Sequence, residues 1–271
     1  MKLVTYIHEG VSRAGVVEEG EVFPLVQGML NTIAGGQTLI AEGASVLLSD
    51  VTLQPPLLNP PRIFGIGLNY VEHAAESQMK VQDVPTVFLK LTSSITGPEM
   101  PIFLPPQATQ PDYEAELAVV IGKGGHNIAA AAWKEYVFGY TILNDVSARG
   151  VQLATTQWTL GKSFPSFTPL GPWIVTADEV GDPHALNIEC VVAGETLQSA
   201  NTRDLIFRIP ALIEYISSIT PLEPGDIIST GTPPGVGLGR TPQRWLKPEE
   251  DVVITIEKIG SLRNRTVAVE R

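Results

Sequence analysis

Short apolar-rich stretches, separated by turns that contain glycine or proline, recur along this chain and predict a mostly β structure. Each is the length of an ordinary strand, which runs over roughly three to ten residues. The predicted strands, by residue number, are 2–7, 14–17, 21–25, 87–90, 138–145, 186–192, 195–198, 227–230, 252–256 and 265–269. The pair 186–192 and 195–198 predicts a β-hairpin.

Two segments have helical features. Residues 209–219 carry apolar side chains at helical spacing and predict an amphipathic helix that packs on the sheet. Residues 129–137 contain good helix formers. Because strands dominate, the sequence predicts an α+β fold that is mostly β.

A proline-rich connector interrupts the chain at residues 54–61, Gln-Pro-Pro-Leu-Leu-Asn-Pro-Pro. Such a segment is stiff, and the composition changes after it. The sequence therefore predicts a small N-terminal domain over residues 1–54 and a larger domain over residues 55–271.

One stretch, residues 112–122, places carboxylates at alternate positions, namely Asp112, Glu114 and Glu116. Alternate residues of a strand share a face, and the apolar run that follows indicates that the strand enters the core. Crowded carboxylates repel one another, so a cation among them is expected, and oxygen ligands favour Mg²⁺, Mn²⁺ or Ca²⁺. The alternative is a strand whose acidic face lies in water.

Composition limits the classes of partner and location. The 271-residue chain has a formal net charge of −11, which argues against nucleic acid or an anionic membrane surface as a partner. The first residues resemble no signal peptide and no window has the length of a membrane span, so we expect a cytoplasmic protein. The single cysteine, Cys190, lies in a predicted strand and is interpreted as structural.

A histidine and a glutamate follow a predicted strand and glycine turn at residues 62–69. His73 and Glu76 are three residues apart and so are neighbours on one face of a helix. A carboxylate that orients an imidazole makes a general base able to activate water, although the same spacing also suits a surface hydrogen bond. Residues 77–85 form either a mobile lid or a simple loop.

Three further features are candidates for the same site. Asp145 ends an apolar strand, where it is placed either to bind a metal beside Glu114 and Glu116 or to cap a helical turn. Lys162 lies among Gly, Trp and Phe, as a desolvated cation for a developing enolate or as a surface lysine. The glycine-proline loop 231–237 offers backbone N–H groups and the Thr232 hydroxyl to a substrate carboxylate, or is a structural turn.

Six motifs occur in order over nearly all of residues 62–260: Gly-Leu-Asn-Tyr-x-x-His-Ala-x-Glu at 67–76, Asp-Tyr-Glu-x-Glu-Leu-Ala-Val-Val-Ile-Gly at 112–122, Gly-Tyr-Thr-x-x-Asn-Asp-Val-Ser-Ala-Arg at 139–149, Gly-Lys-Ser-Phe at 161–164, Pro-Leu-Gly-Pro-Trp at 169–173 and Thr-Gly-Thr-Pro-x-Gly-Val-Gly at 230–237. This set resembles the fumarylacetoacetate hydrolase family, in its bacterial two-domain, acylpyruvase-like form. The sequence departs from the family pattern at Gly150 and Pro165, where the family usually has Asp, and at Ala193 in its Asn-Gly-Glu.

The resemblance implies a mixed β-roll catalytic domain, a small β-rich N-terminal domain and a homodimer. It implies Mg²⁺ or Mn²⁺, with Ca²⁺ as a substitute, held by Glu114, Glu116 and Asp145. It also implies that His73 and Glu76 activate water and that Lys162 stabilises negative charge. The implied substrate contacts are Lys90, Arg149, Gln152 and Thr232.

From these residues we expect an enzyme of small anionic oxo acids. The leading hypothesis is hydrolysis of a carbon–carbon bond in a 2,4-dioxo acid, an acylpyruvate such as fumarylpyruvate or acetylpyruvate, to pyruvate and a carboxylic acid in a catabolic reaction. The alternative is a decarboxylase or tautomerase of an acid such as oxaloacetate, which needs a metal-bound enolate but no nucleophilic water. A non-catalytic binder of oxo acids is a third reading.

Overall fold

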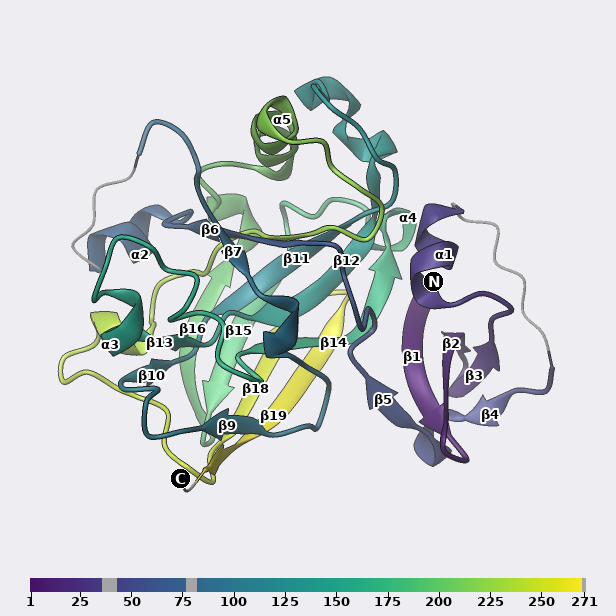
Figure 1. The fold of residues 1–271 in the computed structure, drawn as a ribbon, viewed down its shortest axis with the longest axis horizontal. Coiled ribbons are helices and arrows are strands. Elements are labelled where there is room, and N and C mark those ends of the chain that lie inside the picture. The colour runs from purple at the N-terminus through teal and green to yellow at the C-terminus, as the bar shows by residue number, and fades with distance from the viewer. Residues whose placement is uncertain (36–42, 77–81, 270–271) are drawn as a thin grey trace.

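Two packed sheets form the framework of the chain (Figure 1). The computed structural model describes residues 1–35, 43–76 and 82–269. Its strands are β1 Lys2–His8, β2 Val11–Glu18, β3 Glu21–Pro24, β4 Val46–Leu47, β5 Thr52–Gln54, β6 Ile63–Gly67, β7 Thr86–Lys90, β8 Ile95–Thr96, β9 Ile102–Leu104, β10 Pro111–Asp112, β11 Ala115–Ile121, β12 Val137–Asn144, β13 Ser147–Ala148, β14 Thr168–Thr176, β15 Asn187–Val192, β16 Glu195–Asn201, β17 Ile227–Ser229, β18 Asp251–Ile256 and β19 Gly260–Ala268.

The helices are short and lie at the edges of the sheets. The α-helices are α1 Met29–Ala34, α2 Val71–Glu76, α3 Arg149–Gln152, α4 Ala177–Val180 and α5 Ile209–Ile219. The 3₁₀ turns are η1 Leu48–Asp50, η2 Thr92–Ser94, η3 Ala130–Glu135, η4 Thr202–Asp204 and η5 Gly237–Gly239. Within the described ranges no helix is long and apolar enough to cross a membrane.

The larger sheet has the strand order β4-β3-β2-β1-β14-β12-β11-β17-β6-β7, with β5 beside β1 and β8 beside β14. Its strands pair antiparallel except β17 with β6 and β8 with β14. The smaller sheet has the order β16-β15-β18-β19-β9. Side chains of β11, such as Leu117 and Val119, share one apolar core with Ile188 of β15 and Ile254 of β18. The sheets therefore pack face to face over this core.

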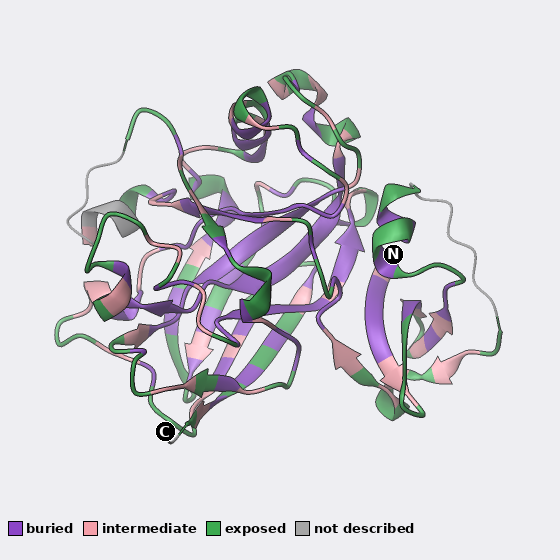
Figure 2. Ribbon diagram, in the orientation of Figure 1, coloured by how far each residue is buried: buried purple, intermediate pink, exposed green. Residues whose placement is uncertain are grey.

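Strand β11 is buried on both faces. Leu117, Val119 and Ile121 point into the core between the sheets, whereas Ala118 and Val120 join a second core on the other face. All seven residues of β11 are buried, and Figure 2 shows the central strands as almost wholly buried. A polar side chain on this strand is therefore held away from water, at a free-energy cost unless it is paired.

The N-terminal strands continue the larger sheet. Strand β1 pairs antiparallel with β14, with Lys2 opposite Val175 and Leu3 opposite Ile174. Strands β1 to β5 thus lie on one side of the molecule but share a sheet with the rest (Figure 1). The boundary between residues 54 and 55 stays a prediction.

Several predicted elements are confirmed. Helix α5 spans residues 209–219 as predicted, with Pro210 in its first turn and Ile209, Leu212, Ile213 and Ile216 buried on one side. The hairpin of β15 and β16 also forms. The helix expected over residues 129–137 is instead the shorter η3, with Trp133 buried.

Candidate functional site

The acidic stretch folds differently from a single continuous strand. It contains β10, which ends at Asp112, and β11, which begins at Ala115, and β10 pairs with β13 rather than with a neighbour of β11. Asp112, Glu114 and Glu116 are 0%, 3% and 1% exposed. The alternative in which the acidic face lies in water is therefore wrong.

The pairing of β11 with β12 brings Asp145 to these acids. In its register Ala115 lies opposite Asn144, and the next backbone N–H, that of Asp145, donates to the carbonyl oxygen of Glu114 at 2.9 Å. Glu114, Glu116 and Asp145 each offer an oxygen, and these oxygens lie within 4.8 Å of one another. This arrangement of buried carboxylates fits a divalent metal site.

A cation already lies between two of these carboxylates. The Lys162 ammonium contacts Glu114 Oε2 and Asp145 Oδ2, each at 2.7 Å. Burial lowers the pKa of Lys162, but the charges of Asp145 and Glu114 outweigh it and the pKa is raised overall. The reading of Lys162 as a surface lysine is wrong, since it is 3% exposed.

Lys90 holds Asp145 from the other side. Its ammonium contacts Asp145 Oδ1 at 2.6 Å and donates to the carbonyl oxygens of Phe167, at 2.9 Å, and Lys162. An ammonium has three donors, so these contacts use all of them. Burial lowers the pKa of Lys90. Lys90 therefore positions Asp145, and its predicted contact with substrate stays a prediction.

Arg149 connects the metal candidates to Asp112. Its guanidinium lies 2.8 Å from Asp112 Oδ2 and 2.6 Å from Glu114 Oε1, and it donates to Gln152 Oε1 at 2.8 Å. Asp112 lies outside the trio of oxygens and accepts from the backbone N–H groups of Gly237 and Leu238. It therefore anchors Arg149 and the glycine-proline loop.

Glu116 is the member of the trio with no cation at ion-pair distance among the described residues. It accepts hydrogen bonds from Ser229 Oγ at 2.5 Å and from the Gly231 N–H at 2.9 Å. Burial, and then the charges of Asp145 and Glu114, raise its pKa well above the usual range. A carboxylate in this position is stabilised as an anion by an added cation.

The sequence did not single out Ser229 or Gln198. Ser229 is opposite Ala118 of β11, which places it next to Glu116 in the sheet. Gln198 Nε2 donates to Thr232 Oγ1 and to the Pro233 carbonyl oxygen, each at 2.8 Å. Its Oε1 accepts from the Ala115 N–H at 3.0 Å. Ser229 is a polar position beside two isoleucines of a predicted strand, whereas Gln198 ends the polar stretch Glu-Thr-Leu-Gln and has no such signal.

The glycine-proline loop is already used by protein carboxylates. The N–H groups of Gly231, Gly235 and Gly237 donate to Glu116, Glu76 and Asp112, respectively. The expectation that they are free for a substrate carboxylate is wrong. Thr232 does line the cavity beside the acids, so its hydroxyl stays a candidate contact.

His73 and Glu76 lie on helix α2, as predicted. Glu76 accepts from the Gly235 N–H at 2.9 Å, which ties the helix to the glycine-proline loop. The side chain of His73 lies outside the described residues, as do residues 77–81 of the predicted lid. The pairing of His73 with Glu76 therefore stays a prediction.

The buried charges of this cluster do not balance by themselves. At their usual charges its four carboxylates, Asp112, Glu114, Glu116 and Asp145, exceed the cations Lys90, Arg149 and Lys162 by one negative charge. A divalent cation would turn this excess into one positive charge, which suits an anionic ligand. The adjoining cavity, lined by Arg149, Gln152, Trp158, Thr232 and Leu238 among others, is about 20 Å³, enough for one water-sized group.

Comparisons with known proteins agree with this geometry. The profile described as fumarylacetoacetate (FAA) hydrolase C-terminal matches residues 62–267. The protein named oxaloacetate tautomerase Fahd2a, mitochondrial, from Rattus norvegicus is 41% identical over 263 residues, which cover 93% of this chain and 84% of that protein.

Solved structures share the fold over the whole chain. Fumarylacetoacetate hydrolase from psychrophilic Exiguobacterium antarcticum has a TM-score of 0.89 and 35% identity, with 99% of this chain and 100% of that chain covered. Maleylpyruvate hydrolase from Sphingobium sp. SYK-6, in complex with manganese(II) ion and pyruvate, has a TM-score of 0.83 and 32% identity, with both chains covered in full. The predicted α+β, mostly β fold is confirmed.

Proposed function

The chain belongs to the fumarylacetoacetate hydrolase family of enzymes, and we propose that it moves a proton on a small 2-oxo dicarboxylic acid, as an oxaloacetate tautomerase. The observation that carries this proposal is the buried cluster of carboxylates and cations, which fits a divalent metal and with one would have a net positive charge for an anionic substrate. The choice of oxaloacetate is supported by the name of the rat relative, which is 41% identical. This reverses the preference expected from the sequence.

The proposed metal is Mg²⁺ or Mn²⁺, with Ca²⁺ as a substitute, held by Glu114, Glu116 and Asp145. When bound, such an ion polarises the 2-oxo group as a Lewis acid. Arg149 and Gln152 line the cavity and bind a substrate carboxylate, and Thr232 donates from the opposite loop. The Lys162 ammonium stabilises negative charge on the enolate oxygen.

The proton is moved by His73 and Glu76 in this proposal. The imidazole removes a proton from carbon 3 of the keto form, and the imidazolium then returns a proton to the enolate oxygen, which gives the enol and restores the neutral imidazole. Glu76 orients the imidazole, because the Gly235 N–H fixes the carboxylate against the glycine-proline loop.

Acylpyruvate hydrolysis is the second candidate, and two observations favour it. Glu76 is fixed beside the loop that carries Thr232, as a base that activates water requires. The solved maleylpyruvate hydrolase, at 32% identity, holds pyruvate and manganese. In this reaction His73 deprotonates water, which attacks the distal carbonyl, and the carbon–carbon bond breaks to release a carboxylic acid and the pyruvate enolate, which is then protonated.

A parallel assay separates the two candidates. Protein stripped with EDTA and reloaded with Mg²⁺ or Mn²⁺ is given oxaloacetate, acetylpyruvate and fumarylpyruvate. Faster metal-dependent exchange between the enol and keto forms of oxaloacetate, with the diketones unchanged, supports the tautomerase. Release of pyruvate from the diketones supports the hydrolase, and inactivity on all three contradicts both.

The role of the histidine is tested by His73→Ala, with His126→Ala as the matched control on an exposed turn histidine. We expect His73→Ala to lower kcat by roughly 100-fold or more while metal affinity, measured by calorimetry, is unchanged. Glu116→Ala should instead weaken metal binding itself. Activity that survives in His73→Ala excludes the proposed base.

The expected homodimer and cytoplasmic location stay proposals, although the rat relative is mitochondrial by name. One feature supports a partner: β7 ends the larger sheet, and its Val87 and Leu89, with the following Leu91, are 36%, 43% and 45% exposed. An open strand edge with apolar side chains favours association. Sedimentation of the original protein and of Leu89→Lys tests association through this edge. A monomer in both samples contradicts the proposed dimer.

A further inference from the structure

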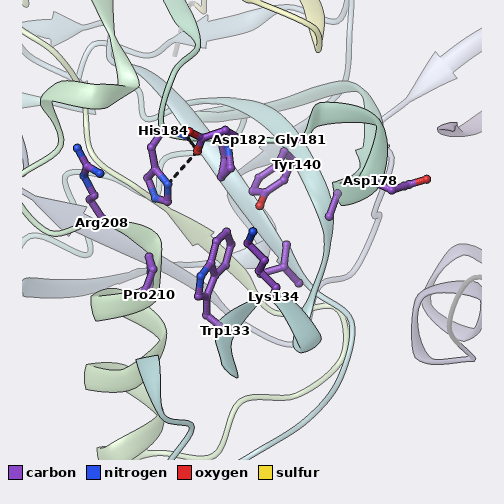
Figure 3. Close-up of a pocket in the computed structure, with 12 residues that line it drawn as sticks. Trp133, Lys134, Tyr140, Asp178, Gly181, Asp182, His184, Arg208 and Pro210 are labelled. Carbon is purple, nitrogen blue, oxygen red and sulfur yellow. Dashed lines mark hydrogen bonds and ion pairs between the residues drawn. The ribbon is translucent and has the colours of Figure 1, made fainter. Parts of the chain in front are cut away.

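A second cavity, of about 760 Å³, lies away from the buried acids, between η3, the first half of β12, α4 and the start of α5 (Figure 3). Its size is within the range of small-molecule sites, roughly 300–1,000 Å³. The lining residues that matter here are Trp133, Lys134, Tyr140, Asp182, His184 and Arg208. None of them belongs to the site proposed above.

Tyr140 carries a polar group that the fold leaves unused. The residue is 1% exposed, and its hydroxyl forms no hydrogen bond within the part of the chain that the structure describes. Figure 3 shows this hydroxyl directed between Trp133 and Lys134. The Tyr140 oxygen itself is open to the cavity, so a ligand that accepts from it gains a hydrogen bond that no group of the described protein makes.

The charges around the cavity favour an anion. Lys134 and Arg208 have no carboxylate at ion-pair distance among the described residues, and they lie on opposite sides of Trp133 in Figure 3. The nearby acids are engaged or turned away. Asp182 accepts from the backbone and ring of His184, and Asp178 bonds Thr176 and points out of the cavity.

The remaining wall is flat and uncharged. Trp133 and His184 meet edge to face with ring centroids 5.8 Å apart. His184 Nε2 accepts from the Ile209 N–H at 3.2 Å while Nδ1 faces Asp182, which is the arrangement of a neutral imidazole. Burial lowers the pKa of His184, which agrees with this form. Lys134 Nζ lies 5.7 Å from the centroid of the Trp133 ring, so a planar, unsaturated body packs on the rest of this aromatic wall with a carboxylate beside that ammonium.

We propose that this cavity is a binding site for a small planar dicarboxylate, separate from the catalytic cluster. One carboxylate lies by Lys134 and accepts from the Tyr140 hydroxyl, the other pairs with Arg208, and the conjugated body covers the Trp133 ring. The site is independent of the proposed reaction, because it shares no residue with the cluster of Glu114, Glu116 and Asp145.

Calorimetric titration at low ionic strength tests the site with terephthalate, benzoate and benzamide, which carry two, one and no negative charges. We expect affinity to fall in that order. In the ¹H–¹⁵N spectrum terephthalate should shift the indole N–H of Trp133, assigned with Trp133→Phe, more than those of the other tryptophans. Equal binding of benzamide, or an unmoved Trp133 resonance, overturns the proposal.

Variants locate the site. Tyr140→Phe removes only the unused hydroxyl and should weaken terephthalate roughly tenfold, whereas Tyr6→Phe, at another 1% exposed tyrosine, should not. Arg208→Gln should weaken it roughly threefold, with exposed Arg203→Gln as the control. Binding that survives Tyr140→Phe and Arg208→Gln, or that is lost in Arg149→Lys instead, overturns the assignment. If a variant does not fold, the shift of the Trp133 indole N–H resonance on addition of terephthalate to the original protein still tests the proposal.

Discussion

Two regions along strand β12 differ in how completely their charged side chains are paired. At the carboxyl end of the strand, Asp145 belongs to a cluster in which the cations Lys90, Arg149 and Lys162 contact carboxylates at 2.6–2.8 Å. Five residues earlier, about 17 Å along an extended strand, Tyr140 faces a cavity whose cations have no acid partner among the described residues. The first region is closed and internally paired, and the second is wide and incompletely paired.

This difference shows that cavity size and catalytic organisation are separate properties. The cavity of about 760 Å³ contains no cluster of metal-ligating side chains within the described chain, whereas the cavity of about 20 Å³ adjoins one. Burying several charges together costs free energy that folding alone does not require. The position of the buried charges, rather than the available volume, therefore identifies the candidate catalytic site.

The largest effect is expected from Asp145→Asn, which breaks the pairing of the closed region. Asp145 is 0% exposed and contacts both Lys90 and Lys162. Loss of its charge leaves the buried Lys90 without a carboxylate and Lys162 with Glu114 alone, so the free energy of unfolding should fall by about 3–5 kcal/mol. Metal affinity should fall roughly 100-fold or more.

Urea unfolding in EDTA and metal titration measure the two effects of Asp145→Asn separately. Asp182→Asn is the matched control, because Asp182 is an exposed acid at the wide cavity. The comparison of the two regions fails if both variants change stability by the same amount.

A smaller effect is expected from Asp112→Asn. Asp112 holds Arg149 and accepts from the Gly237 and Leu238 N–H groups, but it lies outside the trio of metal candidates. We therefore expect metal affinity to fall only about tenfold, and catalytic efficiency to fall with it. If Asp112→Asn abolishes metal binding as completely as Asp145→Asn does, then Asp112 is itself a ligand.

A third variant, Ser229→Ala, measures how much one hydrogen bond to Glu116 contributes to the stability of the cluster. It removes one of the two hydrogen bonds to Glu116 described above. The free energy of unfolding should fall by about 1–2 kcal/mol. Ser218→Ala on the exposed side of α5 is the control and should change it little. If urea unfolding gives equal losses of unfolding free energy for the two serine variants, the hydrogen bond from Ser229 to Glu116 contributes no more to stability than an exposed serine does.

The sequence predicted the elements and the acids well, because both are local patterns. Helix α5 follows from apolar residues three and four positions apart, and the candidate ligands Glu114, Glu116 and Asp145 follow from charge next to apolar strands. These signals need only neighbouring residues. They fix which residues are candidates without fixing what each one contacts.

The contacts themselves depend on residues far apart in the chain. Lys90 and Asp145 are 55 positions apart, and Ser229 and Glu116 are 113 apart. No local pattern predicts such pairs, since the sheet order β12-β11-β17-β6-β7 that carries these residues is a property of the whole fold. For the same reason the sequence could not reveal the wide cavity.

The smallest expected effect concerns pH and the wide cavity. Burial lowers the pKa of His184 below its ordinary value, and the charges of Arg208 and Lys134 act in the same direction, against the opposing charge of Asp182. The unfolded chain, with a histidine pKa of about 6.5, therefore binds a proton more readily than the folded chain. As pH falls through that value the free energy of unfolding should fall, and the loss is absent above it.

His184→Asn removes the titrating group and should flatten this part of the pH profile between about pH 7 and pH 5. Urea unfolding at several pH values measures the change, and His126→Asn, at an exposed histidine, is the control. The free energy of unfolding of the original protein, relative to that of His184→Asn, should decrease as the pH falls. A pH-independent difference would mean that the imidazole contributes by packing against Trp133 rather than by staying neutral, and the uncharged wall of the wide cavity would then not depend on protonation.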